Sequence, residues 1–403
     1  MHSVIGNSFE RKEAREKAAG KAKYTGDLTS PDMLHASIVT ADIAHGFIKS
    51  VETETALKLP GVKAVITGKD CLFLTGVLLE DRPALARDKV RYFGEPVALV
   101  VALSEKEAAI AAQHVKVEYD TLPVVVTAKE ALAHDAPLIH EVLADYKILV
   151  KEITPAPGTN IAAKFSINKG NTDKGFEQSD FIIEQEFILP KSSHAAMETR
   201  AASAEILPDG TVNIVTSSQS PFYVRKLISN VFSIEEGKVH VRVPFVGGSF
   251  GGKAAVQQEI LSYIASRSVG GRPVLVGYTR EQDIAMATSR PGLIARIKIG
   301  CHASGKIMAA DMLFLLESGA YADICPNMSK AIAAGCSGPY NIENLHCDSL
   351  CIYTNQVYST SFRGFAHEAF TFCVERALNI LAERCGIDQN EFRMINAIKP
   401  GDY

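Results

Sequence analysis

The feature that most constrains the fold is a strand–helix–strand pattern that occurs twice near the N-terminus. The segments expected as strands are Leu34–Ala41, Val62–Thr67, Pro96–Leu103 and Val115–Asp120. A short helix is expected at Ser50–Leu59, and an Ala-rich helix is expected after Ser104, which forms a capping box with Glu107. Two such units in succession predict a small α/β domain.

A second region begins after a Pro- and Gly-containing linker, so we expect a domain boundary near Lys151–Asn160. Beyond it, the patterns typical of strands are Phe181–Leu189, Ser203–Ser218, Lys238–Val246 and Pro273–Thr279. Amphipathic helices are predicted at 253–268 and at 368–385, the second ended by Gly386. The fold class is therefore mixed α/β (α+β), with more than one domain in 403 residues.

Composition excludes several classes of function. A net charge of −4 gives no overall basic field for nucleic acid or for an anionic membrane. Neither a secretory signal nor a long apolar run is visible, so a cytoplasmic protein is expected. None of the eight cysteines forms a C-x-x-C pair, and Cys347 and Cys351 alone are a weak metal signal, so free buried thiols are expected.

The segment VPFVGGSFGGKAA, Val243–Ala255, places four glycines between strand-like and helix-like runs. It matches most of a P-loop, but Ala254 replaces the Ser or Thr that ligates Mg²⁺. It also fails the dinucleotide pattern, because Ser249 occupies the position of the second glycine. Two interpretations remain: a loop whose backbone binds an anion at a helix N-terminus, or a tight turn without a ligand.

A second motif, FRGF at Phe362–Phe365, favours the ligand-binding interpretation of the glycine loop. Together with GGSFGGK it resembles the molybdenum hydroxylase family, whose familiar members are xanthine dehydrogenase and aldehyde oxidase. Six weaker matches occur in the family's order, and they are KAKYTGD (Lys21–Asp27), VRYFGEPVALVVA (Val90–Ala102), HAAMET (His194–Thr199), SSQS (Ser217–Ser220), TREQD (Thr279–Asp283) and GAYAD (Gly319–Asp323).

The resemblance implies an architecture. Residues 1–17 would be an N-terminal arm, residues 18–150 the family's α/β hammerhead domain with a connecting segment, and residues 151–403 the first molybdopterin-binding domain. The cofactor would be molybdopterin or its dinucleotide form. The [2Fe–2S] and FAD groups would lie on partner subunits, since the cysteine spacing of an iron–sulfur site does not occur here. A second molybdopterin-binding half or subunit would complete the site, and a homodimer is possible.

The resemblance implies cofactor-binding roles for the residues that match the family's motifs. These residues are Gln219, Gly248, Ser249, Phe250, Gly251 and Arg363. Gln219 matches a glutamine whose amide donates to the oxo group on molybdenum. Ser249 replaces the usual middle glycine, so its φ must be negative unless strain is tolerated. No residue of this chain is expected to ligate the metal directly.

The substrate pocket would include Ala254, Ala331 and Phe365. Purine-oxidising members have a glutamate where Ala254 stands and an arginine where Ala331 stands, so an aldehyde or a non-purine N-heterocycle is the expected substrate. The sequence also departs from the family at Ala366–Ala369, where His367 or Glu368 could shape the pocket or simply begin a helix.

The catalytic base of the family is a glutamate beyond this chain. None of the glutamates here, including Glu198, Glu317 and Glu368, matches its motif, so no catalytic residue is assigned. The chain would be one product of a naturally split gene or a truncated one, and in both cases weak cofactor binding in isolation is expected. Two alternatives stay open: a catalytically silent scaffold of the same fold, and a phosphate- or nucleotide-binding protein that uses the Gly247–Lys253 loop.

Overall fold

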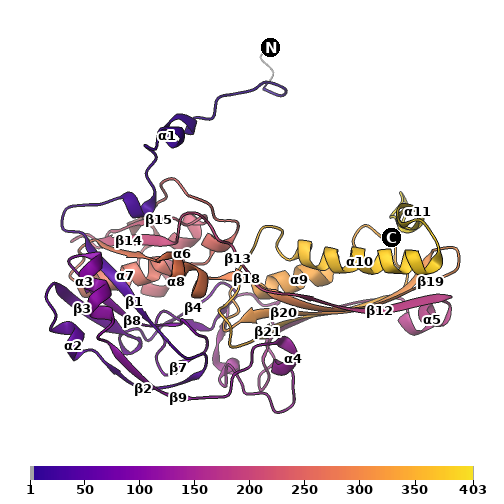
Figure 1. Cartoon of the computed structure of the whole chain (residues 1–403), viewed down its shortest axis with the longest axis horizontal. Helices are drawn as coiled ribbons and strands as arrows, with labels where there is room; N and C mark the ends of the chain where they lie inside the picture. The colour runs from indigo at the N-terminus through magenta and orange to yellow at the C-terminus, as the bar shows by residue number, and fades with distance from the viewer. Residues whose placement is uncertain (1–3, 403) are drawn as a thin grey trace.

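The computed structural model describes residues 4–402 and consists of two lobes, each built on one large sheet (Figure 1). The order of the seven strands in the first lobe is β16 (Val239–Arg242), β15 (Val212–Thr216), β14 (Ala201–Ile206), β17 (Val274–Gly277), β1 (Leu34–Thr40), β8 (Pro96–Ala102) and β3 (Val62–Thr67). The order of the five strands in the second is β11 (Ile161–Lys169), β21 (Leu345–Tyr353), β20 (Ile307–Gly319), β19 (Gly292–Cys301) and β12 (Phe181–Leu189). The mixed α/β prediction is confirmed.

The first lobe combines strands from both sides of the predicted linker. Strand β1 pairs in parallel with β17, with Leu34 opposite Val274, so the N-terminal region and the later region share one sheet. Every residue of β8 is buried, as its continuous apolar run predicts for a strand covered on both faces. Helices α3 (Glu105–Ala112) and α7 (Gln258–Ser268) pack against this sheet.

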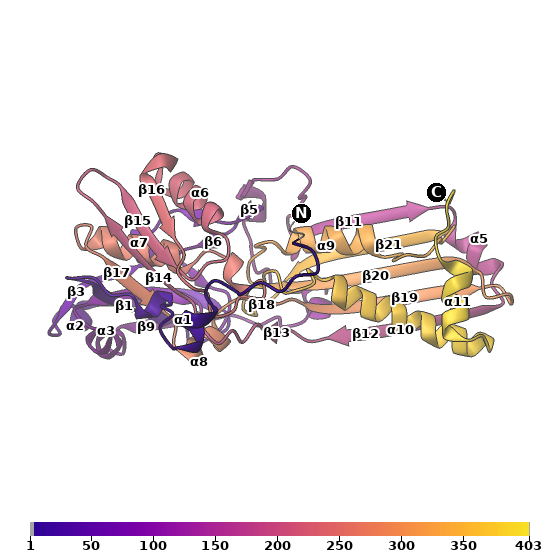
Figure 2. The same ribbon diagram turned by 90° about the horizontal axis from the view of Figure 1, so that it is seen from above.

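The second lobe is a long sheet with its two longest helices on one face. Figure 2 shows helices α9 (Cys325–Gly335) and α10 (His367–Cys385) lying over its strands and running roughly along them, with α11 (Gln389–Asn396) near the C-terminus. Successive side chains of a strand point to opposite faces of the sheet, and the apolar ones pack against these helices. The remaining positions carry charged pairs such as Lys164 with Asp348 at 2.7 Å.

Local predictions agree with the structure at most elements. The strands expected near residues 34, 62, 96 and 116 are present, and Ser104 caps α3 by accepting from the Glu107 N–H at 3.2 Å. The hairpin between β14 and β15 and the left-handed Gly386 that ends α10 are also confirmed. Two expected helices are wrong in their extent.

The helix expected at Ser50–Leu59 is only a single turn, α2 (Glu54–Leu57), because the first residues of that range belong to strand β2 (Gly46–Glu52). Strand β2 pairs along its length with β9 (Lys116–Thr121), and this distant partner overrides the local pattern.

The helix expected at 253–268 begins only at Gln258, because a 3₁₀ turn, Gly252–Ala254, comes first and Ala255 is extended. The glycine loop therefore does not lead directly into an α-helix. Helix α7 is buried from Gln258 to Ser266, so its polar residues lie in the protein interior together with its apolar ones.

Of the expected arm at residues 1–17, the described part ends in the short helix α1 (Ala14–Ala18), which has no buried residue, and it projects from the first lobe (Figure 1). Residues 1–3 lie outside the described structure. All eight cysteines are free thiols, seven of them buried. Between residues 4 and 402 no helix has both the length and the apolar character needed to cross a membrane.

Candidate functional site

Two loops that are far apart in sequence meet where the lobes join. The glycine-rich loop, Gly247–Lys253, follows β16, and the FRGF loop, Phe362–Phe365, follows β21. The Arg363 N–H donates to the Phe250 carbonyl at 2.8 Å. The Ser361 hydroxyl donates to the Gly251 carbonyl at 3.2 Å. The two motifs singled out from sequence therefore form one structural unit.

The backbone of the glycine-rich loop needs its glycines. Gly248 and Gly251 have φ values of +100° and +104°. A Cβ on Gly251 would lie 2.4 Å from the Ser361 carbonyl oxygen, so the two loops touch because no side chain is there. Phe250 also has positive φ, at +55°, and its side chain is 48% exposed. Ser249 is not among the positive-φ residues, so serine fits the middle position without strain.

Ser249 has a second role, because its hydroxyl donates to the side-chain carbonyl of Gln219. That bond orients the amide and leaves the Gln219 NH₂ group free to donate to another acceptor. The Gln219 backbone N–H donates in turn to the Lys253 carbonyl at 3.1 Å. Gln219 lies between β15 and helix α6 (Pro221–Phe232), beside the glycine-rich loop.

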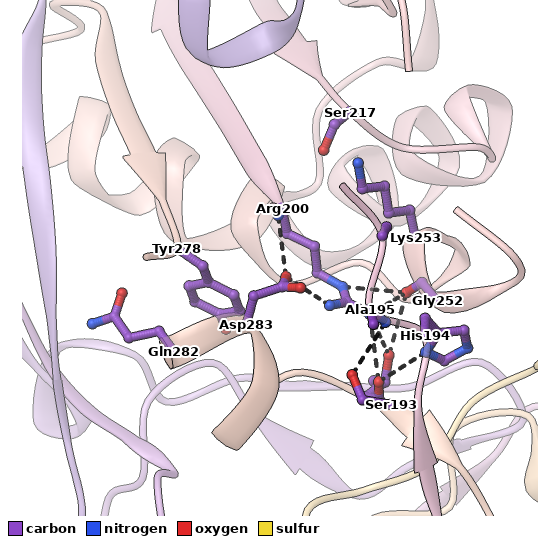
Figure 3. A network of polar contacts seen from close by, with 12 residues as sticks. Ser193, His194, Ala195, Arg200, Ser217, Gly252, Lys253, Tyr278, Gln282 and Asp283 are labelled. Carbon is purple, nitrogen blue, oxygen red and sulfur yellow. Dashed lines mark hydrogen bonds and ion pairs between the residues drawn. The ribbon is translucent and has the colours of Figure 1, made fainter. Parts of the chain in front are cut away.

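A buried arginine supports the loop from beneath. Figure 3 shows Arg200 between the Asp283 carboxylate and the Gly252 carbonyl, with N–O distances of 2.8 and 3.0 Å. The Thr288 hydroxyl also donates to the Gly252 carbonyl, at 3.2 Å. Because the Gly252 carbonyl accepts from both the Arg200 guanidinium and the Thr288 hydroxyl, these two side chains fix the C-terminal half of the loop.

The ring of His194 joins this support to the FRGF loop. It stacks on Phe362 with 4.6 Å between centroids, and Nε2 lies 2.9 Å from the Ser361 carbonyl oxygen. Burial lowers the pKa of His194, which favours a neutral ring in this position.

The donor set of the two loops suits an anionic cofactor. Within the described chain the backbone N–H groups of Gly248, Phe250 and Gly251 have no acceptor, and the Arg363 side chain is exposed. The oriented amide of Gln219 adds a neutral donor. Such a group of backbone, amide and guanidinium donors matches the phosphate and metal-bound oxygens of a molybdopterin cofactor, so the residues present fit this group.

The lysine of the loop is not placed to bind phosphate. Lys253 is 3% exposed, and its ammonium lies 2.6 Å from the Glu198 carboxylate. Burial lowers the pKa of Lys253, while the bond to Glu198 opposes that change. An ammonium paired inside the protein is unavailable to a nucleotide phosphate, which argues against the P-loop alternative.

The FRGF loop ends in an unusual backbone. Phe365 and Ala366 have φ values of +56° and +67°, and Ala366 is the N-cap of α10 without a capping side chain. Consecutive left-handed residues other than glycine cost free energy and are concentrated at functional sites. Phe365 is half-buried against the core of the second lobe, and His367 is exposed at the first turn of α10.

The remaining pocket positions come from different elements. Ala254 is half-buried at the end of the 3₁₀ turn, next to the glycine-rich loop. Ala331 is half-buried on helix α9 of the second lobe. Their contact with a substrate stays a prediction.

The three glutamates considered as bases have different environments. Glu198 is bound to Lys253, and the buried Glu317 accepts from the Ala128 N–H at 2.9 Å. Both carboxylate oxygens of Glu368 are buried without a hydrogen-bond partner in the described chain, against Gly364. None is placed by a motif as a catalytic base, so that expectation is unchanged.

Sequence reasoning missed the support of the loop. Glu198, Arg200 and Asp283 stabilise it, and two of them lie within motifs that the sequence already singled out, HAAMET and TREQD. The sequence did show these side chains as charged residues of opposite sign, but it did not show which of them pair. Their pairing joins positions more than 50 residues apart and is visible only in three dimensions.

Comparison with known proteins identifies the class. Residues 153–397 match the family model of the molybdopterin cofactor-binding domain, and residues 19–123 match the a/b hammerhead domain of aldehyde oxidase and xanthine dehydrogenase. The chain belongs to the molybdenum hydroxylase family of xanthine dehydrogenase and aldehyde oxidase, and its larger part matches the family's molybdopterin-binding domain.

Relatives and solved structures agree with this placement. The carbon monoxide dehydrogenase large chain of Hydrogenophaga pseudoflava is 33% identical over 97% of this chain, which spans 50% of that protein. The nicotinate dehydrogenase large molybdopterin subunit of Eubacterium barkeri is 28% identical over 99% of this chain and 91% of its own length. The aldehyde oxidoreductase structure from Desulfovibrio gigas has a TM-score of 0.88 at 29% identity, covering 98% of this chain and 43% of that one. The chain thus spans about half the length of most of these relatives.

Proposed function

We propose that this chain is the first molybdenum-cofactor-binding part of a hydroxylase that oxidises an aldehyde or an N-heterocycle. The reaction is RH + H₂O → ROH + 2 H⁺ + 2 e⁻, with the electrons passing to iron–sulfur and FAD groups on partner subunits. The observation that supports it best is the junction of the glycine-rich and FRGF loops through the Arg363–Phe250 hydrogen bond, beside the oriented amide of Gln219. When bound, the molybdenum cofactor supplies the two-electron redox chemistry.

The chain's own residues then have distinct tasks. The Gln219 NH₂ group, oriented by Ser249, would donate to an anionic oxygen of the bound cofactor. The N–H groups of Gly248 and Gly251 and the Arg363 guanidinium bind anionic oxygens of the cofactor. Phe250 and Phe365 provide apolar walls that orient a flat substrate and exclude water.

The substrate class follows from two further points. Ala254 and Ala331 offer no charged group to a purine, which leaves aldehydes and other N-heterocycles. The relative of most similar length here is named for nicotinate, an N-heterocyclic acid, and this favours the N-heterocycle.

The free thiols suit a reducing compartment, so we place the enzyme in the cytoplasm. We expect a second molybdopterin-binding region, on this or another polypeptide, to complete the site.

The test is co-expression of the chain with a second molybdopterin-binding region and the iron–sulfur and FAD subunits. Metal analysis and pterin fluorescence should find about one molybdenum and one pterin per complex. An artificial electron acceptor should be reduced with nicotinate-like heterocycles or aldehydes. A complete complex without molybdenum or pterin would refute the proposal, and binding of Mg²⁺–ATP by calorimetry would support the nucleotide alternative instead.

A further inference from the structure

One carboxylate connects the two ends of the glycine-rich loop. Glu198 Oε2 accepts from the Gly247 N–H at 2.7 Å and from the Lys253 ammonium at 2.6 Å. The Glu198 N–H also donates to the Gly247 carbonyl at 3.1 Å, so these two residues are joined in both directions. The loop is thereby closed into a ring whose first and last residues share one acceptor.

The closure depends on burial and on close packing. Lys253 is 3% exposed and the Glu198 side chain 13%, so each charge needs the other in place of water. A Cβ on Gly247 would lie 2.5 Å from the Glu198 Cβ, so only glycine permits this approach. Near the ammonium, Arg200 adds positive charge and Asp283 adds negative charge, and they pair with each other at 2.8 Å.

The ring also connects to the proposed cofactor contacts. The Lys253 carbonyl accepts from the Gln219 N–H and from the Ser218 hydroxyl, both at 3.1 Å. The Lys253 N–H faces the Ser249 hydroxyl at 3.3 Å. A displacement of Lys253 therefore moves both Ser249 and Gln219, the pair that orients the amide donor.

We propose that Glu198 and Lys253 are positioning residues: their ion pair holds the segment Gly248–Gly251 in the conformation that presents its N–H groups, and it sets the place of Gln219. The lysine acts through the loop and does not contact the ligand. The cofactor-binding role of the loop rests on the proposed function, whereas the effect of the Glu198–Lys253 ion pair on the loop conformation does not.

The first experiment uses the purified 403-residue chain without cofactor. Hydrogen exchange measured by mass spectrometry follows peptides covering residues 194–200 and 245–256. Glu198→Gln keeps the size of the side chain and an acceptor for Gly247, but it leaves the ammonium of Lys253 without a counter-charge. We expect about 10-fold faster exchange in both peptides, with exchange in strands β19 and β20 unchanged.

Two further variants make the test specific. Glu198→Gln combined with Lys253→Met removes both charges and should restore part of the protection that Glu198→Gln alone loses. Lys129→Met breaks an exposed pair with Glu186, at 2.7 Å, and should leave the loop peptides unaffected. Unchanged exchange in Glu198→Gln overturns the proposal, and so does a double variant that is no better protected than Glu198→Gln alone.

The second experiment uses the complete complex. Glu198→Gln should lower the molybdenum and pterin content several-fold relative to Lys129→Met, and the double variant should recover part of it. Full cofactor content in Glu198→Gln would overturn the positioning role. A wild-type complex that lacks molybdenum refutes the proposed function instead, and the exchange result on the chain alone then still decides whether Glu198 closes the loop.

Discussion

The Asp81 carboxylate accepts a hydrogen bond from the Ala322 N–H at 2.7 Å across the junction of the two lobes. Asp81 lies between the short strands β5 (Leu79–Glu80) and β6 (Arg82–Pro83), whereas Ala322 follows β20 of the second lobe. The Tyr353 hydroxyl donates to the same oxygen at 3.0 Å. Asp81 is 2% exposed, so a buried acid joins the lobes whose junction carries the candidate site.

Stability should therefore depend on the ionisation of Asp81. Burial raises the pKa of Asp81 from 3.8 to about 7. Between these values the folded protein holds a proton that the unfolded chain has released, so the Asp81 contribution to stability is present at low pH and is lost as pH rises toward 7. We expect wild type to lose about 2 kcal/mol relative to Asp81→Asn between pH 5.5 and pH 8.

Urea unfolding of both proteins at several pH values measures this difference. Burial holds the pKa of His140 well below its ordinary value, so the contribution of His140 to stability rises with pH and opposes that of Asp81. Because both proteins contain His140, this contribution cancels in the difference between them. Parallel stability curves for wild type and Asp81→Asn would contradict the prediction.

Gly251→Ala should separate the two loops. The new Cβ would lie 2.4 Å from the Ser361 carbonyl oxygen at a φ of +104°, so we expect a loss of roughly 2–4 kcal/mol by urea unfolding. Gly386→Ala is the matched control, because its φ is +71° with nothing within 4 Å, and it should cost about 1 kcal/mol. Equal losses in the two variants would mean that the contact between the loops contributes nothing.

Arg200→Met should be among the most harmful changes to the first lobe. It leaves the buried Asp283 with only the longer contact to Arg280, at 3.5 Å, and removes a donor from the Gly252 carbonyl, which predicts a loss of about 3–5 kcal/mol. The exposed pair of Arg296 with Glu184, at 3.8 Å, is the control, and Arg296→Met should cost less than about 1 kcal/mol. Chemical denaturation compares the two, and a small effect at Arg200 would contradict the buried network.

Gln219→Ala should act on the reaction more than on folding. Its side chain is exposed in this chain, so the free energy of unfolding should change by less than about 0.5 kcal/mol. In the complete enzyme we expect kcat to fall about 100-fold, with a smaller change in KM, because an amide donor to developing negative charge is lost. Ser249→Ala, which removes only the orienting hydroxyl, should give a milder loss of kcat. An unchanged kcat in Gln219→Ala would exclude this role.

The substrate proposal is tested at Ala254. Wild-type complete enzyme should oxidise xanthine far more slowly than an aldehyde or a pyridine-type heterocycle. Ala254→Glu introduces the carboxylate that purine-oxidising members have, so the ratio of kcat/KM for xanthine to that for the heterocycle should rise about 10-fold. Ala334→Glu, at an exposed position on α9, is the control for added charge. Rapid xanthine turnover by wild type would refute the assignment.

Much of the local structure was predictable from sequence. Strand Phe181–Leu189, the helix that Gly386 ends and the cap at Ser104 follow from side-chain periodicity and hydrogen bonding within a few residues. The strand at Gly46–Glu52 was not predictable in this way, because its partner β9 lies about 70 residues further along the chain. The ion pair of Glu198 with Lys253 was hidden for the same reason, because its partners are 55 residues apart.

By itself, the sequence determined which residues can belong to the site: glycines with the spacing of a ligand-binding loop, the FRGF segment, and the missing hydroxyl at Ala254. Only the tertiary structure decided their arrangement. It placed Phe250 against Arg363, turned Lys253 inward to Glu198, and let Ser249 orient Gln219. The physical reason is that local pattern specifies backbone conformation, whereas buried charges and unpaired donors are satisfied by whichever distant groups the packed sheets bring within hydrogen-bond reach.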